Sequence, residues 1–296
     1  MRAFAVLLLT LIAAAFLPAS AGSAPAWTPE PTDRWQYQLE GKVDADICEV
    51  PFAGGECVRP DVFDIDLYEP DGKTPSAISV AAIHARGAHA VCYISAGTAE
   101  NFRPDYKQYV KFNKQVGGKM IGKPFSDRFS NENWLDIGPR KHRKFILGRI
   151  AERTQLCAET GFDGVEYDNV ATYEQSRKTT GFKVKESAQL AFNKALADIA
   201  HANGLAVGLK NDLPQLEQLE PSFDFAVNEQ CLQYRECTNN PAPGYRAFLD
   251  AGKAVAQIEY RLEPKEFCPE ANEIGLSSIQ KARDFSLRAE PWVPCK

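Results

Sequence analysis

Several catalytic motifs are missing from this sequence of 296 residues. It contains no GxSxG, HExxH or GxxxxGK[ST] pattern, which argues against an esterase, a metalloprotease or a P-loop nucleotide hydrolase. No CxxC pair occurs, and the four histidines (His84, His89, His142 and His201) are not grouped with cysteines, so we expect no zinc site. The net charge is −5 and the basic residues are scattered, so no nucleic-acid-binding surface is predicted.

Long hydrophobic runs are also absent, except at the N-terminus. There Arg2 precedes an apolar run of about fifteen residues, a break at Pro18 and a small-residue triplet at 19–21. This pattern predicts a secretory signal peptide over residues 1–21 rather than a membrane span. We therefore expect an exported protein, extracellular or periplasmic, without a membrane-spanning segment.

The eight cysteines are an even set, which an oxidising compartment would allow to pair. Metal ligation is the alternative, and their spacing argues against it. Proximity along the chain suggests three disulfides and leaves one remaining pair. The predicted pairs are Cys48 with Cys57, Cys231 with Cys237, Cys268 with Cys295, and Cys92 with Cys157.

After a Pro-rich segment at 22–33, which we interpret as a flexible tail, short apolar runs alternate with longer helical patterns. Two clear helices are expected, one starting near Pro139 and stopping at Gly161, the other from about Lys183 to Asn203. The expected strands are Trp35–Leu39, Val62–Leu67, Ala90–Ser95, Phe162–Tyr167, Leu205–Lys210, Phe223–Asn228, Ala254–Glu259 and Ile274–Ser278. Eight strands that alternate with helices predict a single-domain (β/α)8 TIM-type barrel over residues 34–296.

Two stretches do not fit this alternation. Residues 44–60 contain two cysteines and a Gly-Gly pair, and we interpret them as a disulfide-stapled loop. Residues 102–136 are too long for a simple connection, and long ordered insertions are often functional. Both follow a strand, so in a barrel both are expected near the site at the C-terminal face.

Carboxylates at the ends of apolar strands are the most informative feature of the chain. GFDGVEYDNV places Glu166 and Asp168 two residues apart, on the same face of a strand, and FDFAVNEQC ends in Glu229. Burying an ionised carboxylate costs several kcal/mol unless it is paired, so repeated acids at strand ends indicate a functional site. Hydrolysis of a glycosidic bond requires two such carboxyl groups.

We assign Asp168 as the nucleophile or base and Glu229 as the proton donor. Glu166 lies one step deeper, where burial would raise its pKa. It is therefore either the acid itself or a structural partner of Lys210 on the adjacent strand.

Other polar and aromatic residues are expected around the same mouth. Asp64 and Asp66 either touch substrate or only cap the barrel. Amphipathic aromatic rings suit sugar binding. The remaining candidates for substrate contact are Trp35, Tyr37, Tyr93, Ser95, Trp134, Tyr167, Lys210 and Asn211, with Asp212, Asn228, Glu259 and Tyr260 also at predicted strand ends.

Asp-rich strand ends also suit hard cations such as Mg²⁺ or Ca²⁺. The acids here are spread over several strands without a compact ligand loop, so we expect no metal and no cofactor. A metal-dependent sugar isomerase or lyase on the same barrel is a distant alternative.

Seven ordered segments resemble glycoside hydrolase family 114, the endo-α-1,4-polygalactosaminidase family. They are WQYQLEG, DVFDIDLYEPD, AVCYISAGTAENFRPD, WLDI, GFDGVEYDNVATY, GLAVGLKND and FDFAVNEQC. The resemblance spans roughly 35–276 and implies a TIM-type barrel that hydrolyses α-1,4-linked galactosamine polymers without a cofactor. It implies catalytic acids in the VEYDN and NEQC segments, without deciding between Glu166 and Asp168.

Two functions remain open at this point. The first is an exported, endo-acting hydrolase of an amino-sugar polysaccharide, which we expect to be monomeric. The second is a barrel protein of the cell surface or matrix that binds such a polymer without cleaving it. An acidic mouth would attract a cationic polymer in either case.

Overall fold

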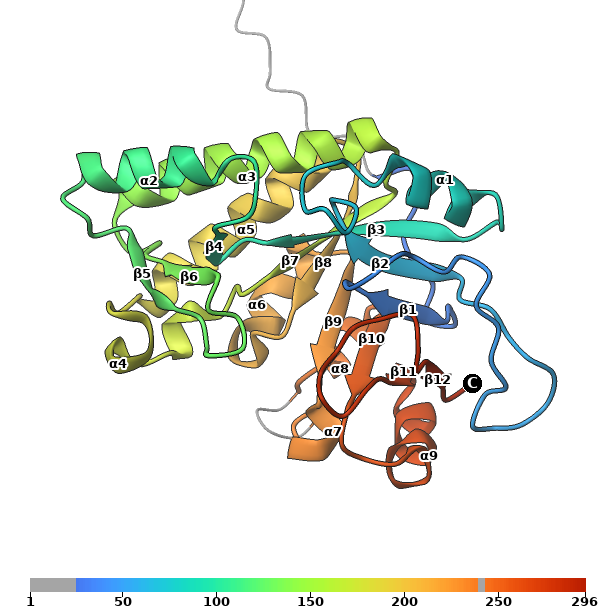
Figure 1. Cartoon of the computed structure of the whole chain (residues 1–296). Coiled ribbons are helices and arrows are strands. Elements are labelled where there is room, and N and C mark those ends of the chain that lie inside the picture. Colours follow the sequence, from blue (N-terminus) through green and yellow to red (C-terminus); the bar gives the residue numbers. More distant parts are fainter. Residues whose placement is uncertain (1–24, 239–242) are drawn as a thin grey trace, which may run out of the picture.

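The computed structural model describes residues 25–238 and 243–296. The predicted signal peptide, 1–21, and residues 22–24 lie outside the described residues. A nine-stranded sheet dominates the structure, with eight parallel strands and one antiparallel strand at its edge (Figure 1). In sheet order the strands are β1 (Trp35–Gln38), β2 (Val62–Asp66), β3 (His89–Ser95), β7 (Gly164–Asp168), β8 (Ala206–Lys210), β9 (Phe225–Glu229), β10 (Val255–Glu259), β11 (Ser277–Gln280) and the antiparallel β12 (Val293–Pro294).

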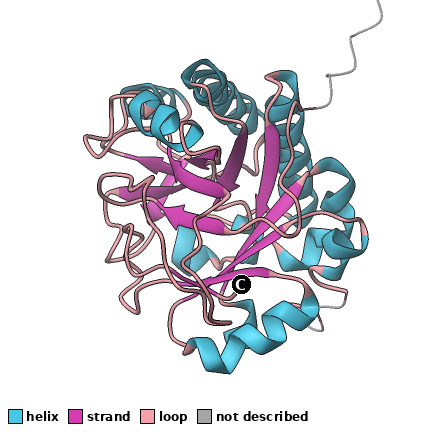
Figure 2. Ribbon diagram, turned by 90° about the vertical axis from the view of Figure 1, so that its right-hand side faces the viewer, coloured by secondary structure: helices cyan, strands magenta, loops and turns pink. Residues whose placement is uncertain are grey.

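Helices surround the strands on the outside, as Figure 2 shows. They provide the crossovers that parallel neighbours require. The α-helices are α1 (Ala77–His84), α2 (Tyr106–Gln115), α3 (Arg140–Thr160), α4 (Arg177–Thr180), α5 (Glu186–Ala202), α6 (Leu216–Leu219), α7 (Cys231–Tyr234), α8 (Arg246–Asp250) and α9 (Pro264–Ile274). Three short 3₁₀ turns, η1 (Thr172–Glu174), η2 (Leu213–Gln215) and η3 (Glu220–Ser222), complete the helical elements of the described residues.

Side-chain hydrogen bonds connect the first parallel strand with the residues directly before β12 and directly after β11. The Trp292 indole donates to the Trp35 carbonyl at 2.7 Å, and the Lys281 ammonium donates to Gln36 Oε1 at 3.0 Å. The sheet is therefore a nearly closed barrel, and the predicted TIM-type fold is confirmed. Inside the barrel, at the amino-terminal ends of the strands, Trp35 packs on Phe225 with ring centroids 5.3 Å apart.

The predicted strands agree with the observed ones except near their ends. The largest difference is the eighth, predicted over Ile274–Ser278 and observed over Ser277–Gln280. Ile274 is instead the last residue of α9, which ends at Gly275 with φ of 98°. Gly161 ends α3 with the same left-handed geometry, as its sequence position predicted.

The long insertion folds into a second, three-stranded antiparallel sheet in the order β4-β6-β5. Its strands are β4 (Thr98–Glu100), β6 (Glu132–Leu135) and β5 (Ile121–Pro124). Figure 1 shows this sheet beyond the ends of β3 and β7, between α2 and α4. The insertion therefore forms a wall at the carboxyl end of the barrel.

All four predicted disulfides are confirmed. Cys48–Cys57 closes the loop after β1, and Cys92–Cys157 ties β3 to α3. Cys231–Cys237 and Cys268–Cys295 hold the segments after β9 and beside β12.

The described part of the N-terminal segment lies against the barrel, where the Trp27 ring stacks on His89 at 4.4 Å. Among the helices of residues 25–238 and 243–296, none has the length and apolarity needed to cross a bilayer.

Candidate active site

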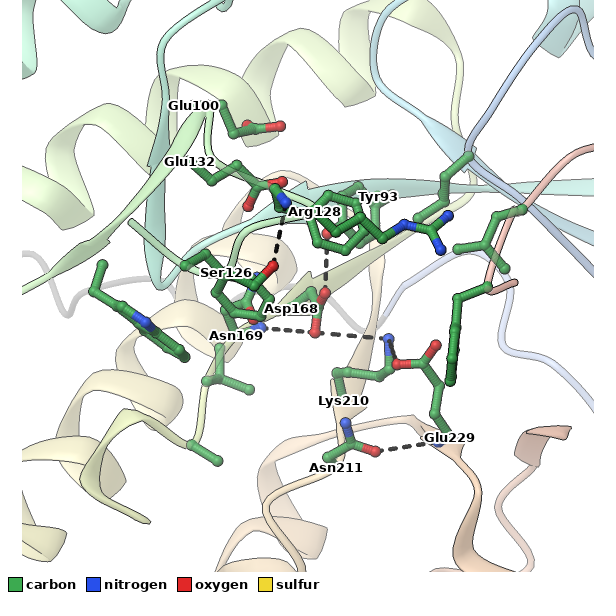
Figure 3. Close-up of a pocket in the computed structure, with 18 of the residues that line it drawn as sticks. Tyr93, Glu100, Ser126, Arg128, Glu132, Asp168, Asn169, Lys210, Asn211 and Glu229 are labelled. Atoms are coloured by element: carbon green, nitrogen blue, oxygen red, sulfur yellow. Dashed lines mark hydrogen bonds and ion pairs between the residues drawn. The ribbon is translucent and has the colours of Figure 1, made fainter. Parts of the chain in front are cut away.

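The carboxyl ends of the parallel strands enclose an open pocket of about 770 Å³ (Figure 3). Because β-strands alternate their side chains between faces, inward residues near the carboxyl ends of the strands point into it. Polar side chains reach the pocket from six barrel strands and from the residue directly after a seventh. They are Tyr37 from β1, Asp66 from β2, Tyr93 from β3, Asp168 from β7, Lys210 from β8, Glu229 from β9, with Tyr260 directly after β10.

Asp168 is fixed at the end of β7 by two hydrogen bonds and an ion pair. The Tyr93 hydroxyl donates to Oδ2 at 2.9 Å, and the backbone N–H of Asn169 donates to Oδ1 at 2.7 Å. The Lys210 ammonium lies 3.6 Å from Oδ1. The side chain is 19% exposed, so it is both oriented and accessible from the pocket.

Two backbone features support this geometry. Asn169 has φ of 60°, which turns the chain sharply after Asp168. Gly97 packs on this turn, and a Cβ there would lie 1.8 Å from the Asn169 carbonyl oxygen. The loop after β3 can therefore approach the loop after β7 only because residue 97 is glycine.

Glu229 faces the same cation from β9. Its Oε2 lies 3.3 Å from Lys210 Nζ, and the Tyr260 hydroxyl donates to Oε1. The Asn211 amide oxygen accepts the backbone N–H of Glu229 at 3.2 Å. The side chain is 29% exposed, so Glu229 also reaches the pocket.

Lys210 lies between these two carboxylates, as Figure 3 shows. Its ammonium donates to the Tyr37 hydroxyl at 2.9 Å and lies 3.3 Å from Glu166 Oε1. Burial opposes the charge, but Asp168, Glu166 and Glu229 outweigh it and hold the lysine pKa well above its usual range. Lys210 is therefore a buried cation shared by three carboxylates.

Glu166 and Asp64 form a buried layer below the pocket. Burial raises the pKa of Glu166 to about 7, although Lys210 opposes this shift. Burial and the adjacent Glu166 carboxylate raise the pKa of Asp64 well above its usual range. The predicted pairing of Glu166 with Lys210 is observed, and neither Glu166 nor Asp64 lines the pocket.

The structure places the other predicted residues as follows. Asp66, Tyr93, Trp134, Lys210 and Asn211 line the pocket. Asp66 is held by Arg103, whose two terminal nitrogens donate to it at 2.7 and 2.6 Å.

Three predicted contacts lie elsewhere. Trp35 is in the barrel core. The Tyr167 hydroxyl bonds to Thr154 of α3 at 2.7 Å, outside the barrel. Ser95 is buried, and its hydroxyl forms hydrogen bonds with the Thr98 hydroxyl and with the Asn169 side-chain amide, which donates to it. Ser95 therefore holds the turn after Asp168 in place without lining the pocket.

Among the other strand-end residues, Tyr260 lines the pocket and three do not. Asp212 bonds to Tyr173 and Asn193, and Asn228 to Tyr245. Glu259 points outward and accepts the first N–H groups of α7.

Sequence reasoning missed the contribution of the small sheet. Glu132 of β6 lines the pocket and accepts a hydrogen bond from Thr98 at 3.0 Å. Burial and the nearby Glu100 carboxylate raise the pKa of Glu132 to about 7. The sequence signal for this part of the pocket was the length of the insertion. It predicted that the insertion lies near the site, but it did not identify Glu132 as a residue of the pocket.

No cluster of three His, Cys, Asp or Glu side chains suited to a metal ion is found in the part of the chain that the structure describes. Around the Lys210 ammonium, the arrangement offers the carboxylates of Asp168 and Glu229 and the hydroxyls of Tyr37, Tyr93 and Tyr260.

Two solved structures are similar to this fold over most of the chain. Aspergillus fumigatus Ega3, solved in complex with galactosamine, is 27% identical, with a TM-score of 0.70 over 90% of this chain and 97% of that one. The glycoside hydrolase domain of Pseudomonas aeruginosa PelA shares the fold at 13% identity, with a TM-score of 0.56 over 88% of this chain and 97% of that one.

A relative is also found by sequence. An uncharacterised protein of Deinococcus radiodurans is 24% identical over 88% of this chain and 87% of its own length. The model of glycoside hydrolase family GH114 matches residues 17–295. This match covers nearly the whole chain, so the protein belongs to glycoside hydrolase family 114.

Proposed function

We propose that the protein is an exported, endo-acting hydrolase of α-1,4-linked galactosamine polysaccharide, with Asp168 and Glu229 as its catalytic pair. The observation that carries this proposal is the position of the two carboxylates on either side of Lys210 Nζ, at 3.6 and 3.3 Å, in an open pocket. A glycosidic bond placed above the ammonium would have one carboxyl group on each side.

Asp168 is suited to be the nucleophile or base. Tyr93 and Asn169 donate hydrogen bonds to it and Lys210 forms an ion pair with it, so its lone pairs are oriented and its charge is balanced without being buried completely. Glu166 instead lies beneath Lys210, away from the pocket. We therefore favour Asp168 over Glu166 as the acid of the fourth barrel strand.

Glu229 is suited to be the proton donor. It gives its proton to the departing glycosidic oxygen while the bond from that oxygen to the anomeric carbon breaks. The anomeric carbon is attacked from the opposite face, either by Asp168 as nucleophile or by a water molecule that Asp168 deprotonates as base. The negative charge then left on Glu229 faces the Lys210 ammonium and the Tyr260 hydroxyl, so both groups stabilise the transition state in which the proton leaves.

The charge of the pocket supports an amino-sugar substrate. Seven acidic side chains line it, against only three basic ones, Arg103, Arg128 and Lys210. Each of these basic groups lies within 4 Å of a carboxylate. A polymer with free amino groups is cationic near neutral pH and would be drawn to this pocket. Galactosamine bound to Ega3 supports the same sugar class.

Two features support export. The N-terminal sequence has the pattern of a signal peptide, and all eight cysteines are paired in disulfides, as an oxidising compartment permits.

The test is incubation of the purified mature chain with a partly deacetylated α-1,4-galactosamine polymer. We expect new reducing ends and a rapid fall in polymer length, as endo-cleavage produces. Co-sedimentation with the polymer without reducing-end release would support the alternative, a binding protein that does not cleave. Loss of activity in chelator would instead favour a metal-dependent isomerase or lyase.

A further inference from the structure

A second cavity of about 310 Å³ lies beside the pocket, between the loops that follow β1 and β2. We call it the outer cleft. It is lined by the loop segments 38–43 and 66–76, with Phe102 and Arg103 as the wall toward the pocket. Leu39, Asp66, Phe102 and Arg103 line both cavities, so the outer cleft is adjacent to the active-site pocket along the same face of the barrel. Its volume is at the lower end of the range for small-molecule sites, about 300–1,000 Å³.

Phe102 presents an apolar surface at the junction of the two cavities. Its residue is 37% exposed, whereas most large apolar side chains of the described residues are buried. The other exposed ones (Val50, Phe52, Ile78 and Tyr234) line neither cavity. An accessible aromatic ring on a cavity wall is suited to lie against the apolar face of a sugar.

The position of Phe102 is fixed before any ligand arrives. The Arg103 guanidinium lies 4.7 Å from the Phe102 ring centroid and 5.1 Å from that of Tyr68. Arg103 is itself held by Asp66 and by Glu100, the latter at 2.7 Å. A Cβ at Gly72 would lie 3.1 Å from Phe102 Cδ2, so the absence of a side chain at 72 leaves room for the ring. A fixed ring loses little entropy on binding.

The charge of the outer cleft has the same sign as that of the pocket. Three acids line it (Asp66, Glu69 and Asp71), against one base, Arg103. Arg103 is bonded to Asp66 and Glu100, which leaves the negative charges of Glu69 and Asp71 without a cation among the lining residues. Glu69 is oriented by the Ser79 hydroxyl at 2.9 Å. A positively charged amino sugar is therefore favoured over a neutral or acidic one.

We propose that the outer cleft is a distal subsite, which binds a hexosamine unit of the polymer through the Phe102 ring and the acidic loop at Glu69 and Asp71. This inference rests on the proposed function and extends it, because it gives the direction in which the polymer leaves the catalytic pocket. Chains long enough to reach the outer cleft gain binding energy that shorter chains cannot, so catalytic efficiency rises with chain length.

The experiment compares Phe102→Ala with wild type on a ladder of α-1,4-linked galactosamine oligosaccharides. Removal of a ring contact is expected to lower kcat/KM about three- to tenfold for long oligosaccharides. The shortest cleaved oligosaccharide should lose less efficiency than the long ones, because it cannot reach the outer cleft, although Phe102 also lines the pocket. Phe102→Trp should restore the chain-length dependence, and Glu69→Gln should weaken it for free amines but not for fully acetylated chains.

Phe52→Ala is the matched control, because Phe52 is similarly exposed at 42% but lies in the Cys48–Cys57 loop and lines neither cavity. It should leave the whole ladder unchanged. An equal loss on short and long chains in Phe102→Ala, or no loss on either, would overturn the distal subsite.

Binding measured by calorimetry separates this inference from the proposed function. In an Asp168→Asn background, which removes turnover, addition of Phe102→Ala should weaken binding of a long oligosaccharide three- to tenfold. If wild type cleaves no galactosamine polymer and Phe102→Ala still weakens binding, the proposed function fails and the subsite stands. If wild type cleaves the polymer and binding is unchanged, only the subsite fails.

Discussion

The ammonium nitrogen of Lys210 lies 3.6 Å from Oδ1 of Asp168, at the floor of the pocket. It also lies 3.3 Å from Glu166 and 3.3 Å from Glu229, so a single cation balances the carboxylates of the site. Charges this deeply buried are stable only when they are paired, and removal of one partner leaves the others uncompensated. The site therefore depends on Lys210 for both its stability and its reactivity.

Lys210→Met removes this cation and keeps the side-chain length. We expect kcat to fall by at least about 100-fold and the free energy of unfolding at pH 7 to fall by about 3 kcal/mol or more. Lys253→Met is the control, because Lys253 also pairs with a carboxylate, Glu220, but lies outside the pocket. It should cost stability without changing kcat. Normal kcat in Lys210→Met, measured by reducing-end release, would contradict this role.

Asp168→Asn and Glu229→Gln test the proposed catalytic pair directly. Each variant should lower reducing-end release by at least about 1,000-fold, because the amide can neither attack the anomeric carbon nor transfer the proton. Both side chains are partly exposed, so the melting temperature should change little. Asp224→Asn is the control, since Asp224 bonds to His201 and directly precedes β9, at the opposite end of the barrel. Persistent activity in either catalytic variant would reassign that residue.

The product anomer follows from the spacing of the two carboxylates. Since both contact Lys210 Nζ, their nearest oxygens are at most about 7 Å apart. Retaining enzymes place these groups about 5–5.5 Å apart and inverting enzymes about 6.5–9.5 Å, so the approach of both acids to one ammonium favours retention. We therefore expect the α-anomer to form first, observed by NMR during early hydrolysis. Initial appearance of the β-anomer would show inversion.

The barrel and its catalytic strands could be predicted because their signals are local. Inward-facing positions two residues apart placed Glu166 and Asp168 on one face, and parallel order brought Glu229 to the same end. The ion pair between Lys210 and Glu166 could be predicted because β7 and β8 are adjacent strands.

The rim of the pocket could not be predicted in the same way. Glu132 and Phe102 belong to an insertion whose position depends on contacts with segments that are distant in sequence. Phe102 packs against Gly72 in the loop after β2, and Gly122 of β5 packs against the end of α4. Two of the predicted aromatic contacts with substrate were wrong, because they were chosen by residue type alone. Trp35 starts its strand and is therefore in the core, and Tyr167 alternates outward between two inward acids.

The stability of the fold should depend on pH through its buried carboxyl groups. The pKa of Glu166 is raised by burial from 4.5 to about 7. The native state therefore binds this proton more tightly than the unfolded chain does, and the free energy of unfolding falls as pH rises from about 4.5 to about 7. Glu132 and Glu259, with pKa values of about 7, and Asp212, at about 8, act in the same direction.

Glu166→Gln should reduce this dependence. The variant cannot ionise, so its loss of stability between pH 5 and 8 should be smaller than that of wild type by about 1–3 kcal/mol. Denaturant unfolding at the two pH values measures the difference. A variant with the wild-type slope would show that Glu166 is already ionised at pH 5.

Activity on a cationic polymer should depend on ionic strength. The pocket and the outer cleft are both lined by more acids than bases, so they attract a partly deacetylated chain over a distance set by screening. That distance is about 30 Å at 0.01 M salt and about 8 Å at 0.15 M. We expect kcat/KM for the deacetylated polymer to fall about tenfold or more between these conditions.

The matched control substrate is the fully acetylated polymer, which carries no amine charge and should be cleaved with the same kcat/KM at both salt concentrations. A salt effect of equal size on both polymers would assign it to the enzyme's own charges, and no effect on either would remove electrostatic attraction as a basis for substrate choice.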